Sequence, residues 1–174
     1  MNLLQLEQCI AEYGKDIYAF CRHLTGDKAE ADELYQDTFL KAMEMLGMIE
    51  YERNPKSFLV GIAIRLWNNK RRKYAWRKRI TGTEEVHEEI EWDTGTGNSP
   101  EEEAIQKELN RIVRKAVAGL DEKYRIPIYL FYTEQMTVEE ISKVLKMPQG
   151  TVKTRLFKAR KLLKKELEVV LDEN

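Results

Sequence analysis

Several cations surround a single aromatic residue, Phe157, in the C-terminal part of the sequence. At about 100° per residue, as in an α-helix, Phe157 falls apart from the apolar residues and among lysines. An aromatic ring in this setting suits contact with thymine methyl groups or sugars, while the cations hold phosphates. Residues 136–167 carry nine Lys or Arg against three Glu, a local charge of +6. The residues expected on this polar face are Lys153, Thr154, Phe157, Lys158, Lys161, Lys164 and Lys165.

A helix-turn-helix is the element expected to position this face. Thr137 and Glu140 have the spacing of a capping box, which predicts a short helix starting at Val138. Pro148 suits the first position of a second helix, where its missing N–H costs nothing. The caps, the turn and the exposed Phe157 favour DNA binding over the alternative of a merely solvated amphipathic helix. The apolar stripe that should pack on the first helix is Val152, Leu156, Ala159, Leu163 and Leu167.

A second basic segment, residues 65–79, holds eight Lys or Arg and no acid. Trp67, Tyr74 and Trp76 lie among these cations, and such a mixture can stack unpaired bases and follow a phosphate backbone. For Trp67 alone a core role is favoured. Tyr74, Trp76 and the basic run together indicate nucleic-acid binding.

Two helices of the N-terminal part are predicted from apolar spacing and from a cap. The first covers residues 3–24, and Gly14 is a candidate break within it. The other has Asn54 as its cap and Pro55 as its first residue. Residues 58–66 of that helix are apolar nearly all round and should form the central core helix. The apolar residues of the first helix are Leu3, Leu6, Ile10, Ile17, Phe20 and Leu24.

A helix between them should run from Lys28 to about Leu46, because Asp27 and Glu30 repeat the capping-box spacing. Its outward face has Leu40 among acids and glutamine. Single exposed leucines are common, so this face alone allows either a partner site or ordinary surface. The predicted inward stripe is Ala31, Tyr35, Thr38, Ala42 and Met45. The outward residues are Asp32, Glu33, Gln36, Asp37 and Leu40.

The composition favours an all-α protein. The 174 residues are 43% hydrophobic and 34% charged, with only 4 Pro and 9 Gly. Residues 84–103 carry nine acids and no Lys or Arg, and residues 81–99 are predicted to be a flexible acidic linker. Two small helical domains are therefore expected, at 1–80 and 100–174. The second should contain four helices around one core.

Two of these four helices precede the helix-turn-helix. One is expected to start at Pro100, after Ser99, and the next to run from Leu120 to Thr133. The inner face of the helix from Pro100 is predicted to be Ile105, Leu109, Ile112, Val113, Ala116 and Val117.

The sequence gives little support for an enzyme, a metal site, a cofactor or a membrane protein. Cys9 and Cys21 are expected to be ordinary buried or half-buried thiols, and His23 a surface or capping residue. With His87 as the only other histidine, no zinc spacing exists, and no nucleophile motif is present. No apolar stretch approaches a membrane span of about 18 residues, and the N-terminus does not read as a secretory signal. We expect a cytoplasmic protein.

Three segments together resemble the extracytoplasmic-function sigma factors, the group-four members of the sigma-70 family. They are DELYQDTFLKA, NPKSFLVGIAIRLWNNKRRK and GLDEKYRIPIYLFYTEQMTVEEISKVLKMPQGTVKTRLFKARKLL. The resemblance covers nearly the whole chain and implies a protein that binds core RNA polymerase and directs it to a small set of promoters, of a stress or envelope type. The implied partners are the β′ clamp helices and the β subunit of the polymerase, promoter DNA and an anti-sigma factor, with no membrane insertion of the chain itself.

The resemblance also implies roles for individual residues. Those matching the segment that binds the β′ clamp helices are Asp32, Glu33, Gln36, Asp37 and Leu40. The helix from Pro55 resembles the segment that reads and melts the minus-ten element, which implies DNA contacts by Arg65, Asn68, Asn69, Arg72, Lys73 and Trp76. The helix from Pro148 resembles the reader of the minus-thirty-five element, which implies contacts by Thr151, Lys153, Thr154, Arg155, Phe157, Lys158 and Lys161.

This chain departs from the family pattern at two positions. Many members have Asn where this chain has Arg65, so the minus-ten base contact made there does not carry over. Members often have Pro before the acidic pair where this chain has Asp121, which should affect a turn and not the activity.

Two other functions are weighed against a sigma factor. A polymerase-independent helix-turn-helix regulator would bind a palindrome as a dimer and would not need the acidic face around Leu40. An RNA-processing or nucleotide-modifying enzyme would use the basic aromatic segment as a substrate groove, but requires a catalytic constellation that the sequence lacks.

Overall fold

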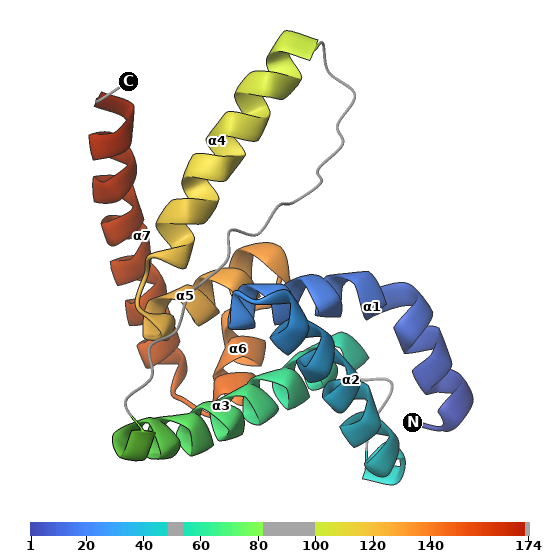
Figure 1. Cartoon of the computed structure of the whole chain (residues 1–174). Helices are drawn as coiled ribbons and strands as arrows, with labels where there is room; N and C mark the ends of the chain where they lie inside the picture. The colour runs from blue at the N-terminus through green and yellow to red at the C-terminus, as the bar shows by residue number, and fades with distance from the viewer. Residues whose placement is uncertain (49–53, 82–99, 173–174) are drawn as a thin grey trace. The chain divides into compact units, whose positions relative to one another are not determined.

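The structure is a computed structural model that describes residues 1–48, 54–81 and 100–172 (Figure 1). Side chains are described for residues 1–48, 54–73 and 104–169. Every regular element in these ranges is helical, in agreement with the predicted all-α class. The chain divides into two compact units, the first built on α1, α2 and α3, and the second on α4, α5, η2, α7 and most of α6. The predicted linker lies outside the described residues except for Thr81.

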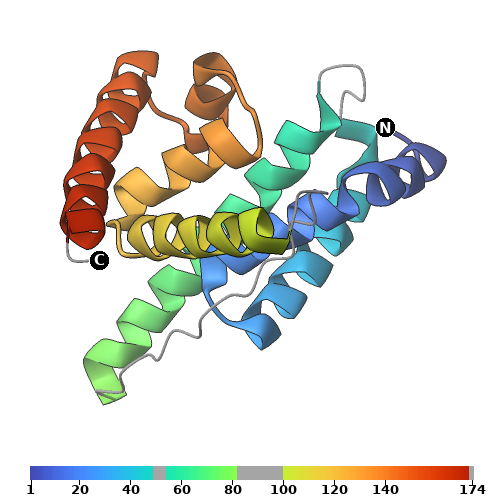
Figure 2. The same ribbon diagram turned by 90° about the horizontal axis from the view of Figure 1, so that it is seen from above.

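In the first unit, α1 (Leu3–Thr25), α2 (Lys28–Glu44) and α3 (Pro55–Thr81) pack against one another in all three pairs (Figures 1 and 2). A short 3₁₀ helix, η1 (Leu46–Met48), follows α2, so this helix ends before the predicted Leu46. The first half of α3 is the predicted core helix. Leu59, Val60 and Ala63 of this half are fully buried, as are Ile17 and Phe20 of α1.

Local capping explains where these helices begin. Asn2 and Gln5 form a reciprocal capping box at the start of α1. Asp27 accepts a hydrogen bond from the Glu30 N–H over 2.8 Å at the start of α2. Asn54 does the same for the Ser57 N–H over 3.1 Å at α3, as predicted.

Gly14 does not break α1, contrary to the prediction. The helix is continuous, and Gly14 is buried where a Cβ atom would lie 3.0 Å from the Tyr35 hydroxyl of α2. The glycine therefore allows a close approach of two helices. Two of the apolar residues of α1, Leu3 and Ile10, are 52% and 40% exposed.

The second unit contains α4 (Pro100–Ala118), α5 (Glu122–Ile128), α6 (Val138–Leu145) and α7 (Gln149–Asp172). The predicted helix over residues 120–133 is two elements, because α5 passes into a π-helix, η2 (Tyr129–Thr133). Asp121 is the N-cap of α5. The core of this unit contains Ile126, Leu130, Ile141, Val152 and Leu156.

The start of α4 is more exposed than predicted. Ala116 and Val117 are buried near its C-terminus, and Ile112 is half-buried. The three other residues of the predicted inner face, Ile105, Leu109 and Val113, are 63%, 40% and 43% exposed. Figure 1 shows why, since α4 and α7 separate toward the beginning of α4. No helix among the described residues is long and apolar enough to cross a membrane.

Candidate nucleic-acid and partner interfaces

The outward face of α2 holds an exposed leucine among acidic residues. Leu40 is 58% exposed, and at about 100° per residue it lies in the middle of the face that the five predicted residues form. Glu33, Gln36 and Asp37 are also exposed. Asp32 is half-buried, because its Oδ1 atom accepts a hydrogen bond from the Tyr18 hydroxyl over 2.7 Å. This arrangement suits a partner that combines an apolar contact with basic side chains.

An ion pair joins the α2 face to the basic segment of α3. The Lys70 ammonium lies 2.6 Å from Glu33 Oε2 and 3.7 Å from Glu30 Oε1. Partial burial alone would lower the pKa of Lys70, but the Glu33 hydrogen bond and the charges of Glu30, Glu33 and Asp37 outweigh it and raise this pKa. The Glu30 side chain therefore faces Lys70 and does not cap α2. The Asp27 N–H donates instead to Thr25 Oγ1 over 3.4 Å, so of the predicted capping box only the bond from the Glu30 N–H to Asp27 forms.

The exposed face of α3 brings the predicted DNA-binding residues together. Five of the six are exposed, and at about 100° per residue all six positions fall on one side of the helix. Arg72 Nη2 donates to Asn69 Oδ1 over 2.6 Å, which fixes this guanidinium along the helix surface. The five exposed residues are Arg65, Asn68, Asn69, Arg72 and Lys73.

Of the three aromatic residues of this segment, the structure describes the side chain of Trp67. Trp67 is only 8% exposed, which confirms that it is a buried residue. Its indole N–H has no hydrogen-bond acceptor within the described part of the chain. The side chains of Tyr74 and Trp76 lie outside the described residues, so the predicted stacking role of Trp76 stays a prediction.

The helix-turn-helix forms as predicted from α6 and α7. At its start Thr137 and Glu140 make both bonds of the capping box, since the Thr137 N–H donates to Glu140 Oε2 over 2.8 Å and the Glu140 N–H to Thr137 Oγ1 over 3.2 Å. In the turn, Ser142 Oγ donates to the Met147 carbonyl over 2.6 Å. The Pro148 carbonyl accepts from the Thr151 and Val152 amides, so α7 begins at Gln149, one residue later than predicted.

The two sides of α7 are as different as the sequence indicated. Val152, Leu156 and Ala159 are buried, whereas Phe157 is 65% exposed. Thr154 Oγ1 donates to the Gly150 carbonyl over 2.9 Å, so this oxygen can still accept a hydrogen bond from a base but has no proton to give. The predicted residues that are exposed are Lys153, Thr154, Phe157, Lys158 and Lys161, and those that are half-buried are Thr151 and Arg155.

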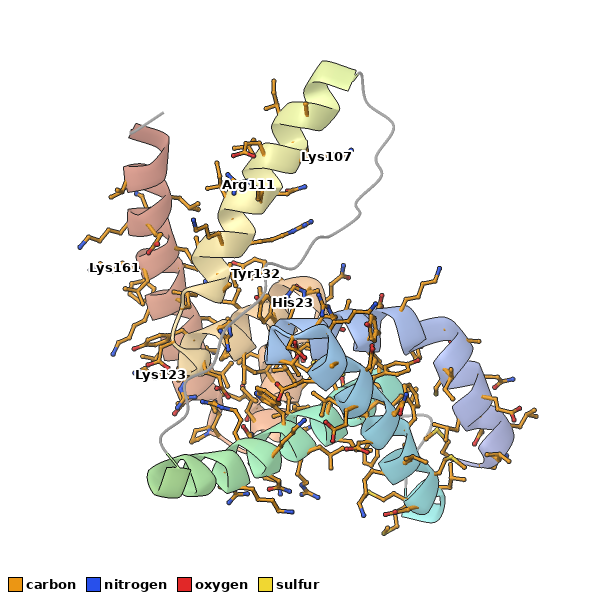
Figure 3. All side chains as sticks on the ribbon, viewed as in Figure 1. His23, Lys107, Arg111, Lys123, Tyr132 and Lys161 are labelled. Carbon is orange, nitrogen blue, oxygen red and sulfur yellow. The ribbon has the colours of Figure 1, made fainter. Side chains whose placement is uncertain are left out.

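A groove of about 340 Å³ lies between the start of α7 and the start of α5. The α5 residues that line it are Lys123 and Tyr124, which the sequence did not suggest as binding residues. Lys123 Nζ lies 2.8 Å from Asp121 Oδ2 and 5.1 Å from the centre of the Tyr124 ring. Figure 3 shows Lys123 at this end of the second unit. The lining residues are Lys123, Tyr124, Gly150, Thr151, Thr154, Arg155 and Lys158.

The charges around the groove shift the pKa values of Asp121 and Lys123. Hydrogen bonds from Lys123 and the charges of Lys123 and Arg125 lower the pKa of Asp121. Asp121 in turn raises the pKa of Lys123, against a smaller opposing effect of Arg155. Only the fold brings Lys123 and Arg155 together, so residue spacing gave no signal of this pair.

A second cluster that the sequence did not suggest joins η2 to α7. Arg160 Nε donates to the Tyr132 hydroxyl over 2.8 Å, and its guanidinium lies 5.5 Å from the Phe131 ring centre and 5.7 Å from the Tyr132 ring centre. Tyr132 is 55% exposed and is labelled in Figure 3. This contact fixes the position of α7 against η2 at the surface of the second unit.

The two cysteines are free and buried, as predicted. Burial, with a smaller contribution from Glu12, raises the pKa of the Cys9 thiol, which makes a reactive thiolate unfavourable. His23 is half-buried in the last turn of α1. Within residues 1–48, 54–81 and 100–172, no group of three His, Cys, Asp or Glu is arranged to hold a metal ion.

Comparison with known proteins finds sigma-factor relatives along both units. Residues 9–77 match the family Sigma-70 region 2, and residues 110–163 match Sigma-70, region 4. The ECF RNA polymerase sigma factor SigW of Bacillus subtilis is 30% identical over 161 residues, which cover 89% of this chain and 84% of SigW. SigX of the same species is 28% identical over 171 residues, covering 92% of this chain and 82% of SigX.

The fold agrees with these relatives. The sigma factor RpoE of Bartonella quintana, solved in complex with the anti-sigma factor NepR, superposes with a TM-score of 0.77 at 21% identity, over 94% of this chain and 96% of RpoE. The identity and coverage shared with SigW, together with both sigma-70 regions, establish that this chain belongs to the extracytoplasmic-function family of RNA polymerase sigma factors.

Proposed function

We propose that this protein binds core RNA polymerase through α2, recognises a promoter through α3 and α7, and so initiates transcription of a limited set of genes. The observation that carries the proposal is the separation of three surfaces within a sigma factor. One is acidic with a central Leu40, and the other two are basic and lie on different units.

The acidic face of α2 is the proposed polymerase interface. It lies within the part of the chain that matches sigma-70 region 2. Leu40 supplies the apolar contact, and Glu33 and Asp37 beside it supply charges that a basic partner would pair with. The β′ clamp helices are the proposed partner of this face, with further contacts to the β subunit.

The two basic faces are the proposed promoter interfaces. The exposed side of α3 takes the minus-ten element, where a flipped base loses a few kcal/mol of stacking that the protein must offset. The exposed side of α7 takes the minus-thirty-five element in the major groove, where cations contact phosphates and Phe157 contacts base edges. The half-buried Arg155 and the groove residues Lys123 and Tyr124 extend this second interface toward the DNA backbone.

The proposed domain limits are residues 1–80 for the polymerase and minus-ten domain and 100–174 for the minus-thirty-five domain, joined by residues 81–99. Because the protein acts with core RNA polymerase in this proposal, we propose that it is located in the cytoplasm. Because RpoE was solved with an anti-sigma factor, we also propose that a comparable protein restrains this chain until an inducing signal arrives.

An in vitro transcription assay tests this function directly. Purified core polymerase is incubated with genomic fragments, with and without the protein, and transcript starts are mapped. Discrete new starts that need both components are expected, and they give the promoter sequence. Specific binding of a palindrome by the protein alone, without such transcripts, would contradict the proposal and favour the dimeric regulator.

The acidic face has its own control in the same assay. Leu40→Asp should abolish new transcripts, whereas Leu4→Asp, at a leucine of α1 that is 65% exposed, should retain them. Equal loss in both variants would indicate a general effect of adding a charge to the first unit.

A further inference from the structure

The groove beside α7 has an uneven distribution of charge. Its lining includes the cations Lys123, Arg155 and Lys158 and contains no acidic residue. Tyr124 and Thr151, which carry hydroxyl groups, also line it. Cations and hydroxyls around an open groove of about 340 Å³ suit an oxyanion such as a backbone phosphate of DNA.

Only one of the three cations has a close counterion. The Lys123 ammonium is 2.8 Å from Asp121 Oδ2, immediately outside the lining. Within the described residues, no carboxylate forms an ion pair with Arg155 or Lys158. A phosphate that enters the groove therefore meets Arg155 and Lys158, which form no ion pair within the described residues. It also meets Lys123, which is already paired with Asp121.

Asp121 holds Lys123 through local geometry. Its Oδ1 atom accepts from the Lys123 backbone N–H over 3.3 Å as the cap of α5, while Oδ2 faces the side-chain ammonium of the same residue. The ammonium also lies over the Tyr124 ring at 5.1 Å from its centre. Lys123 is thus kept at the edge of the groove and paired with a carboxylate.

We propose that the groove binds one backbone phosphate of promoter DNA and that Asp121 weakens this contact, as a competing counterion of Lys123. This inference rests on the proposed minus-thirty-five role of α7. In a specific complex, α7 lies in the major groove in register with the bases of its element. A backbone phosphate then lies where it displaces the Asp121 carboxylate from Lys123. In a non-specific complex the phosphate is not held there, and Lys123 remains with Asp121.

The replacement Asp121→Asn tests the proposal without removing the cap, because Asn is as good an N-cap residue as Asp. Affinity is measured by fluorescence anisotropy of the full chain on two short duplexes. One carries the minus-thirty-five element mapped by the transcription assay, and the other is a scrambled sequence of the same composition. Glu108→Gln is the matched control, because Glu108 pairs with Arg111 in an exposed local ion pair on α4.

The expected result is a gain in affinity that is larger on the mapped duplex. Asp121→Asn should raise affinity for that duplex by about two- to fivefold, the range for one exposed charge pair, because the phosphate no longer has to displace a carboxylate. On the scrambled duplex, the salt dependence should steepen by up to about 0.9 in the log–log slope, because Lys123 is freed to contact phosphate. Affinity for the scrambled duplex should rise less, because its phosphate is not held in the groove, so the ratio of the two affinities rises. Lys123→Gln, combined with Asp121→Asn, should remove the gain.

Three results would overturn the proposal. The first is an unchanged or lower ratio of the affinity for the mapped duplex to that for the scrambled duplex in Asp121→Asn. The second is an equal gain in Glu108→Gln, which would indicate net charge alone. The third is a gain that persists when Lys123 is also replaced. If the wild-type chain discriminates between the duplexes, these results leave the proposed function intact; if it does not discriminate, the minus-thirty-five role of α7 fails as well.

Discussion

Lys70 of α3 donates a hydrogen bond to Glu33 of α2 across 2.6 Å, and this ion pair links the acidic face of α2 to the basic segment of α3. Glu33 belongs to the acidic face around Leu40, and Lys70 lies next to exposed Asn69 on the basic face. The contact crosses 37 residues of sequence. It also pairs one cation of the basic segment with a carboxylate of α2.

This ion pair should contribute modestly and pH-dependently to stability. The pKa of Lys70 is raised in the folded chain, so its contribution is fully present below the unfolded pKa of about 10.4 and is lost as pH rises through the folded value. Because the Lys70 side chain is 38% exposed, Lys70→Met should cost less than about 1 kcal/mol in the free energy of unfolding at pH 7.

Urea denaturation followed by circular dichroism measures this difference at neutral and alkaline pH. Lys41→Met is the control, since Lys41 pairs with Glu44 within α2 and joins no two helices. A loss of unfolding free energy in Lys70→Met that grows above pH 10 would contradict this prediction.

Leu40 should be a binding residue without a structural role. It is 58% exposed, so Leu40→Asp should leave the melting temperature unchanged. The same change should weaken binding to core polymerase by at least about tenfold, as expected for a central apolar anchor. Pull-down titration with purified core polymerase measures the affinity, and Leu4→Asp is the matched exposed leucine. Wild-type affinity of Leu40→Asp would remove this face from the polymerase interface.

Lys158 and Phe157 should affect DNA binding in different ways. Lys158→Ala removes the proposed phosphate contact and should lower the salt slope of duplex binding by about 0.9. Phe157→Ala should change the preference among bases with little change in the slope, because an aromatic contact releases no counterions. Anisotropy titrations at several salt concentrations separate the two effects. Identical slopes for the wild type and Lys158→Ala would exclude a phosphate contact at Lys158.

Gly14 should be required by the Tyr35 hydroxyl and not by backbone conformation. A Cβ atom at this position would lie 3.0 Å from Tyr35 Oη, while Tyr35 is held edge-on by the Tyr18 and Phe39 rings. Gly14→Ala should therefore destabilise the first unit by about 1 kcal/mol, a typical cost of overpacking reduced by the better helix propensity of alanine.

Replacing Tyr35 by phenylalanine supplies the test of this explanation. In the Tyr35→Phe background the obstructing oxygen is gone, and Gly14→Ala should become neutral or stabilising by up to about 1 kcal/mol. Urea denaturation of the four proteins in this double-mutant cycle gives the coupling energy. Equal costs in both backgrounds would place the strain elsewhere.

The sequence by itself determined the helices and the outward character of most candidate residues. Capping at Thr137 and Glu140 acts over three residues, and the stripe from Val152 to Ala159 repeats with the helical period, so both are visible in residue spacing. The same local periodicity placed Leu40 and Phe157 on exposed faces.

Only the tertiary structure decided which residues from different helices meet. Residue spacing has no signal for Glu33 finding Lys70, or for Lys123 of α5 lining a groove with Arg155 of α7. Residue spacing also gave wrong predictions for Gly14, whose neighbour Tyr35 lies on another helix, and for Ile105, which is exposed. Figure 1 shows that α4 and α7 lie apart toward the start of α4. Helical periodicity tells which side of a helix is apolar, but packing between distant segments decides what covers that side and which charges are neutralised.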